Sequence, residues 1–188
     1  FGANKAFDWS SHSSFSYDHN VDMANVVGST THELSTIGSL YLRERLSVNY
    51  SQRGWHLGAK VQGSYNRMTG QRSDFKEISA WDYSYGLTAR LPLPGKVGLS
   101  TDFTVFSRRG YTDTQLNTNH FIWNLRLERS ILHGNLTFAL DGFDLLHELS
   151  NVTRTVNAQG RTETYHNVIP SYFMLHAIYK FNLSPKKR

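Results

Sequence analysis

The residues best suited to chemistry in this chain are its histidines, of which there are nine among 188 residues. They are scattered, at His12, His19, His32, His56, His120, His133, His147, His166 and His176. None follows the two-histidine spacing of a helical zinc site, and the chain has no cysteine to complete a ligand set. We therefore expect no metal site, and we interpret the histidines as polar side chains on a surface or a water-filled wall.

One short stretch contains the residue types of a hydrolase site, namely Asp144, His147 and Ser150. A catalytic triad needs acid, base and nucleophile to converge in space, which proximity in sequence does not ensure. The chain also lacks the glycine-rich patterns GxGxxG and GxxxxGK[ST] that hold nucleotides. We expect no catalytic residue and no cofactor, and we predict that the protein is not an enzyme.

A second set of charged residues lies on the polar sides of alternating segments. The acids are Asp82, Asp102, Glu128 and Asp141, and the cations are Arg43, Arg45, Lys60, Arg90, Arg126 and Lys180. If these sides point into a barrel, they form a wet, charged wall. Such a wall could guide a solute or contact a plug domain. It could instead only satisfy its own charges by mutual pairing, which is the interpretation we favour.

The elements that must position these residues show a period of two, which is typical of half-buried strands. In the segment 36–50, for example, Leu40, Leu42 and Leu46 share one side, interrupted by Glu44, while Arg43 and Arg45 share the other. The same pattern predicts strands at 36–50, 55–66, 81–91, 97–105, 121–128, 135–141 and 171–181, with one more near 7–17. These are about eight strands of about 10 residues, the length that a tilted strand needs to cross a bilayer.

Connections of two lengths alternate between these segments. The short ones lie at 51–54, 92–95 and 131–134, and the long ones at 66–78, 107–119 and 143–170. We expect the short turns on the periplasmic side and the long loops outside, with 143–170 forming a long external hairpin loop, as in outer-membrane barrels. Aromatic residues near strand ends, such as Trp55, Tyr65 and Trp81, fit the girdles at the two membrane interfaces.

The charge of the chain is +5, which raises the question of nucleic acid as a partner. The cations are spread along the strands, and only Lys186, Lys187 and Arg188 form a run. Without a basic stripe or a stacking module we expect no nucleic-acid binding. Scattered cations on a barrel could meet anionic headgroups or line a pore.

The last third of the chain carries a more specific signal. It contains DGFDLL at 141–146, NVTR at 151–154, NAQGRTET at 157–164, NVIPSYFML at 167–175 and YKFN at 179–182. This succession resembles the C-terminal end of the TonB-dependent receptor-like outer-membrane β-barrel family. The resemblance covers most of the chain and is strongest from about residue 121 onward.

That resemblance implies a barrel of about 22 strands with a plug domain, TonB as energy-coupling partner, and uptake of a scarce solute. Because only about eight strands are visible, it implies that 1–188 is the C-terminal segment of a larger barrel. The closing strand near Phe181 resembles the signal that barrel assembly reads, and 184–188 would be a periplasmic extension. Some family members are components of outer-membrane complexes and do not transport, so a surface lipoprotein or other subunit is another possible partner.

We therefore predict an all-β fold, an antiparallel transmembrane β-barrel in contact with outer-membrane lipid, located in the cell outer membrane. Two alternatives stay open. The first is a self-contained eight-stranded barrel that serves as an anchor or adhesion module. The second is a soluble binding barrel of lipocalin type, in which the apolar side chains would fill the centre.

Overall fold

The structure is a computed structural model that describes residues 6–25, 32–71, 75–150, 152–157 and 160–181. Its strands are β1 (Phe7–Asn25), β2 (His32–Gln52), β3 (Trp55–Gly70), β4 (Ile78–Leu93), β5 (Val97–Arg109), β6 (Asn119–Ile131), β7 (Leu136–Phe143), β8 (Val152–Asn157), β9 (Gly160–Tyr165) and β10 (Tyr172–Tyr179). Two 3₁₀ turns, η1 (Thr114–Leu116) and η2 (Leu132–Gly134), complete the elements. The extension expected at 184–188 lies outside the described residues.

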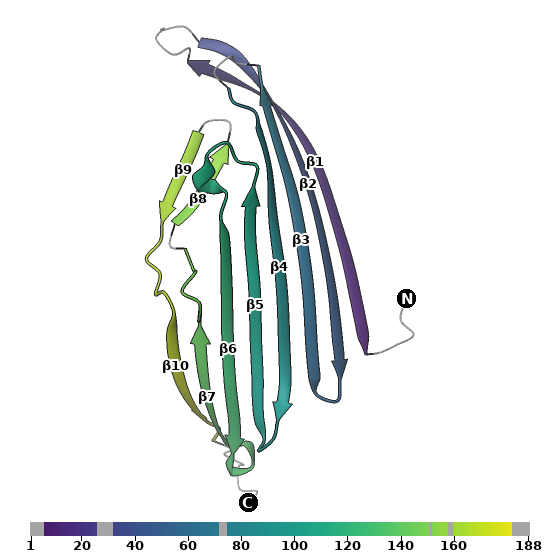
Figure 1. The fold of residues 1–188 in the computed structure, drawn as a ribbon, viewed down its shortest axis with the longest axis vertical. Helices are drawn as coiled ribbons and strands as arrows, with labels where there is room; N and C mark the ends of the chain where they lie inside the picture. Colours follow the sequence, from purple (N-terminus) through teal and green to yellow (C-terminus); the bar gives the residue numbers. More distant parts are fainter. Residues whose placement is uncertain (1–5, 26–31, 72–74, 151, 158–159, 182–188) are drawn as a thin grey trace, which may run out of the picture.

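Eight strands form one antiparallel sheet, in the order β1-β2-β3-β4-β5-β6-β7-β10 (Figure 1). From β1 to β6, each strand pairs with the next one along the chain. The last strand, β10, then pairs with β7. The sheet is open, with β1 at one edge and β10 at the other. The separate hairpin β8–β9 lies between β7 and β10 in the chain. The predicted all-β antiparallel architecture is confirmed.

The two faces of the sheet follow the period-two pattern of the sequence. On the apolar face the large side chains are open, with Leu87 60% and Leu175 75% exposed. The polar face holds Ser64 and Asp141, both buried. Buried hydrophobic residues among those described are limited to Ala80, Leu116 and Ala139. The apolar side chains of the described sheet thus fill no common core. In a small soluble barrel, by contrast, they would fill the centre.

The short connections are tight because their residues adopt positive φ. Arg53 and Gly54, with φ of 53° and 82°, make the two-residue turn between β2 and β3. Two successive positive φ values match the twist of antiparallel strands, and glycine accepts such a conformation without steric cost. The second turn lies at Gly95 and Lys96, slightly later than the expected 92–95, because Pro92 and Leu93 still pair with β5.

Strands β1 to β6 are longer than the expected 10 residues, reaching 21 in β2, whereas β7 and β10 have 8 each. The predicted loop at 66–78 shrinks accordingly, because β3 continues to Gly70, and the loop at 107–119 begins after Arg109. The reason is that backbone pairing does not require an apolar face, so residues 67–70 extend the ladder beyond the strand expected at 55–66.

Within the predicted loop 143–170 the structure contains the short hairpin β8–β9. Gln159 and Gly160 form a turn signal in the sequence between these two strands, and this turn falls partly outside the described residues. Among the described residues, no helix is long and apolar enough to span a membrane.

Candidate functional site

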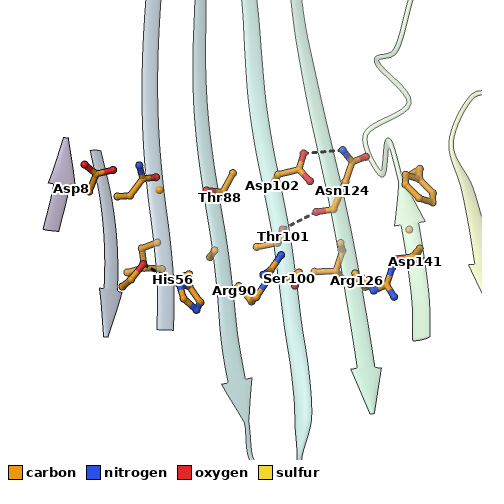
Figure 2. Close-up of a pocket in the computed structure, with 18 residues that line it drawn as sticks. Asp8, His56, Thr88, Arg90, Ser100, Thr101, Asp102, Asn124, Arg126 and Asp141 are labelled. Carbon is orange, nitrogen blue, oxygen red and sulfur yellow. Dashed lines mark hydrogen bonds and ion pairs between the residues drawn. The ribbon is translucent and has the colours of Figure 1, made fainter. Parts of the chain in front are cut away.

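Two rows of polar side chains cross the polar face near the short-turn ends of the strands (Figure 2). They line a groove of about 710 Å³. One row contains Asp8, Thr88, Asp102 and Asn124, and the other contains His56, Arg90, Ser100, Arg126 and Asp141. The antiparallel register creates these rows, because it places each residue directly opposite its neighbour on the next strand.

Asp141 is the most strongly bound carboxylate of these rows, with only 5% of its surface exposed. Its Oδ2 lies 2.8 Å from Nε2 of His176 and 3.5 Å from Nη1 of Arg126. Arg126 also donates through Nε to Glu128 at 3.3 Å. This network, the Asp141 cluster, joins β6, β7 and β10. It contains an acid, a cation and a histidine but no hydroxyl nucleophile in hydrogen-bond contact.

The second row is tied to the loop that follows β7. Asn124 donates through Nδ2 to Asp102 at 2.9 Å, and its Oδ1 accepts the backbone N–H of Asp144 at 2.9 Å. The Asp144 carboxylate, 3% exposed, accepts the backbone N–H groups of Glu148 and Leu149. Asp144 therefore fastens the start of the loop to the sheet.

Asp144, His147 and Ser150 were considered above as a catalytic triad, but the Asp144 carboxylate is occupied by backbone N–H groups. The Ser150 hydroxyl exchanges hydrogen bonds with the backbone of Val152, at 3.0 and 3.1 Å. His147 has a φ of 58°, and its backbone N–H donates to the carbonyl of Asp144. The three residues form a hydrogen-bonded turn, in which carboxylate and hydroxyl serve the backbone and do not align as base and nucleophile.

A further cluster lies at the long-loop end of the polar face. Arg108 donates to Asp82 at 3.1 Å and to the Tyr111 hydroxyl at 2.8 Å, and Tyr111 donates to Asp82 at 3.1 Å. The Arg108 guanidinium also lies over the Tyr111 ring, 4.5 Å from its centroid. Burial raises the pKa of Tyr111, which lies in the loop after β5. The cluster holds this loop against the end of the sheet.

Four cations on the polar face of β2, β3 and β4 are arranged differently from the charged clusters just described. Within the described structure, Arg43, Arg45, Lys60 and Arg90 have no carboxylate at ion-pair distance. Arg45 donates to the neutral Gln62 at 2.9 Å, and the Arg43 guanidinium lies 5.0 Å from the Tyr41 ring centroid. The mutual pairing that we favoured from the sequence therefore describes only one half of the sheet. Lys180 is exposed just after β10.

Arg108 and Tyr111 were missed in the sequence, and His176 was interpreted only as one of nine scattered polar histidines, without its contact with Asp141. Arg108 could have been found, because residues equally distant from a tight turn face each other, and Asp82 and Arg108 are equidistant from Gly95. The contact of His176 could not, because a long connection separates β7 from β10 and leaves their register open. Tyr111 lies in a loop, where no periodicity applies.

The described residues include no group of three or more His, Asp or Glu side chains that could hold a metal ion. Chemically, the polar face offers hydrogen bonds and charges for binding.

Residues 6–179 match the model of the outer membrane protein beta-barrel family. The match is to this family as a whole and carries nothing specific to TonB-dependent receptors. The search of curated proteins found no match, and the search of solved structures found none. The matched region contains all eight strands of the open sheet with their apolar and polar faces. The chain therefore belongs to the outer membrane protein beta-barrel family, and it is located in the outer membrane.

Proposed function

We propose that this chain forms the C-terminal part of the barrel of a TonB-dependent receptor-like protein, which takes up a scarce solute across the outer membrane. The apolar face contacts lipid and the polar face lines the interior. The plug domain and the contact with TonB belong to other parts of the full-length protein. The long connections and the hairpin β8–β9 face outward, where they contact the solute or a surface lipoprotein.

The observation that carries the proposal is the inequality of the two free edges. β1 has 19 residues and β10 has 8, so pairing one with the other would leave more than half of β1 without a partner. Unpaired backbone is costly in lipid, and closed barrels avoid it. In a larger barrel, β1 pairs with a preceding strand that matches its length, and β10 pairs with the first strand of the barrel.

The tail motifs support the receptor assignment within the family. Two segments resemble receptor tails: 141–146, where the Asp144 backbone N–H donates to Asn124 on β6, and 167–175, which leads into β10 and its pairing with β7. They include Asp144, whose carboxylate binds the loop backbone. The motif thus has a structural reason, which is to hold a long external connection on the last strands of the barrel.

The test uses the full-length protein extracted from outer membranes in detergent. We expect a native mass several times the 21.5 kDa of this chain, and co-purification with the periplasmic domain of TonB. A TonB domain that cannot bind its partners serves as the control. A native barrel of about this mass without TonB binding would contradict the proposal.

A second candidate, the self-contained eight-stranded barrel, requires β1 and β10 to meet. Because the chain has no cysteine, engineered pairs give a clean readout. Ala177→Cys on β10 is combined in turn with Trp9→Cys, Ser11→Cys and Ser13→Cys on β1. Disulfide formation in any pair favours the small closed barrel. A larger native mass without crosslinking favours the receptor segment.

A further inference from the structure

Four cations on the polar face descend diagonally across three neighbouring strands. Arg43 and Arg45 lie two positions apart on β2, Lys60 follows on β3, and Arg90 follows on β4. From Arg43 to Arg45 to Lys60 each step moves one row toward the short turns, and Arg90 lies two rows further. A row corresponds to about 7 Å along a strand, and neighbouring strands are about 5 Å apart. We call these four residues the cationic track.

Among the described residues no carboxylate lies at ion-pair distance from these four cations, and two acids, Asp8 and Asp102, lie in the row between Lys60 and Arg90. In the register, the residues of β3 opposite Arg43 and Arg45 are Ser64 and Gln62, and Lys60 faces Ser47 and Gly86. All of these are neutral. The acids of the polar face instead bind other partners, as Asp82 does with Arg108 and Asp141 does with Arg126 and His176.

Arg43 adds an observation that points to a ligand. Its Nε is buried and has no hydrogen-bond acceptor. Buried donors in folded proteins almost always have an acceptor, and an orphaned one calls for a partner that the described residues do not supply. The contact with Tyr41 holds the guanidinium in place, 5.0 Å from the ring centroid, and so orients its fork. A guanidinium held in this way suits the two oxygens of a carboxylate or phosphate.

The lower end of the track opens into the polar groove. Arg90 lines this groove together with His56, Thr88 and Ser100 (Figure 2). The aliphatic stem of Lys60 extends over β4, where it occupies the space that a side chain at Gly86 would take. An anion that leaves Arg45 thus finds the next cation one row further down.

We propose that the cationic track binds the carboxylate or phosphate groups of an anionic solute and passes the solute along the inner wall toward the groove. The proposal rests on the proposed function in solute uptake, and it names the class of solute. A series of cations without ion-paired carboxylates attracts anions while leaving each single contact weak enough to break. The rival occupant is an acidic surface of the plug domain, which would cover the same residues permanently.

The test measures binding of pyrophosphate and citrate to the full-length protein in detergent by titration calorimetry. The track variant combines Arg43→Gln, Arg45→Gln and Lys60→Gln. The control variant combines Arg53→Gln, Lys96→Gln and Arg129→Gln, which lie in the short turns and on the apolar face and remove the same net charge. Gel mobility that shifts on heating checks that each barrel is folded.

We expect the wild-type protein to bind both anions, with an affinity that decreases as salt increases. The track variant should bind about tenfold more weakly or worse, and the control variant should stay within about twofold of the wild type. If the track variant does not fold, the single variants Arg45→Gln and Lys60→Gln carry the comparison.

Equal losses in both variants would mean that net charge alone attracts the anions, and would overturn the proposal. Absence of binding in the wild type would also overturn it, and would assign the track to the plug domain. TonB co-purification is measured separately and does not depend on anion binding. Failure of this inference is therefore distinguishable from failure of the proposed function.

Discussion

A charge placed at Leu87 should reveal which face of the sheet meets lipid. Leu87 lies on the apolar face of β4, 60% exposed, between Ala59 and Phe103 in the register. From Leu87 the strand runs on to Leu93, which is ~20 Å along the strand at about 3.3 Å per residue. With a tilt of about 40°, this is ~15 Å along the membrane normal.

That depth lies close to the middle of an apolar band about 25 Å tall. An arginine facing lipid at the midplane costs about 2–4 kcal/mol in the free energy of unfolding, and we expect this cost for Leu87→Arg. The neighbouring residue, Thr88, faces the polar side and lies opposite Asp102. Thr88→Arg therefore meets water and a carboxylate, and its cost should be within about 0.5 kcal/mol of zero.

The assay is equilibrium unfolding of the full-length protein in lipid vesicles with guanidinium chloride, followed by tryptophan fluorescence. The two variants have the same added charge in adjacent positions, so the difference between them isolates the face. Equal costs at the two positions, or a larger cost at Thr88, would show that the apolar face does not meet hydrocarbon and would refute the orientation of the whole sheet.

Three further predictions concern the clusters and turns. Asp141→Asn should lower the free energy of unfolding by about 1–2 kcal/mol, because it weakens a buried charged contact. Glu128→Gln, at an exposed side chain, should lower it by less than about 0.5 kcal/mol. Equal effects of the two variants in denaturant unfolding would contradict the role given to the Asp141 cluster. Burial raises the pKa of Tyr111 above its ordinary value of 10.0, so its stabilising contribution is present below about pH 10 and lost as pH rises through the higher folded pKa. The 295 nm absorbance of wild type minus Tyr111→Phe should then titrate later than the other tyrosines, and an earlier transition would disprove the effect. Gly95→Ala should lower the free energy of unfolding by about 1 kcal/mol, because Gly95 has a positive φ. Gly110→Ala should lower it by more, because Gly110 also has a positive φ and a Cβ there would lie 2.6 Å from the carbonyl oxygen of Ser79. Thermal unfolding that ranks the two variants the other way would contradict this reasoning.

The regular part of the sheet could be predicted from sequence because a period of two is a local property. Leu40, Leu42 and Leu46 fall on one face whichever strand lies next to them, and Gly54 marks a turn through its φ of 82°. Strand ends were less accessible. Outside the lipid the choice of side chain no longer depends on the face of the sheet, so Arg67 and Thr69 were predicted as loop although both pair with β2.

The pairing of charges could be predicted only where a tight turn fixes the register. Arg126 lies opposite Asp141 because the short turn between β6 and β7 allows little else. No such constraint sets β10 against β7, and the contact of His176 with Asp141 therefore depends on the three-dimensional course of a long connection. That Arg43 and Lys60 lack an ion-pair partner could not be predicted from one strand alone. It depends on the neighbours that the register places opposite them, such as Ser64, Ser47 and Gly86, being neutral.

Glu44 shows how two strands can depart from the apolar pattern together. It interrupts the apolar face of β2, where an ionised carboxylate facing lipid is unfavourable unless donors surround it. β1 supplies them in register, because Ser11 donates to its Oε1 at 2.7 Å and Ser13 donates to its Oε2. On the other side Gly63 lies opposite Glu44 and exposes no side chain. The serines that break the apolar pattern of β1 thus explain the acid that breaks the pattern of β2, because hydrogen bonds to a charged group offset part of its desolvation. The polar interruption of the apolar face is therefore shared by β1 and β2. On either side of it the apolar pairs Phe15–Leu42 and Trp9–Val48 keep both strands facing the membrane.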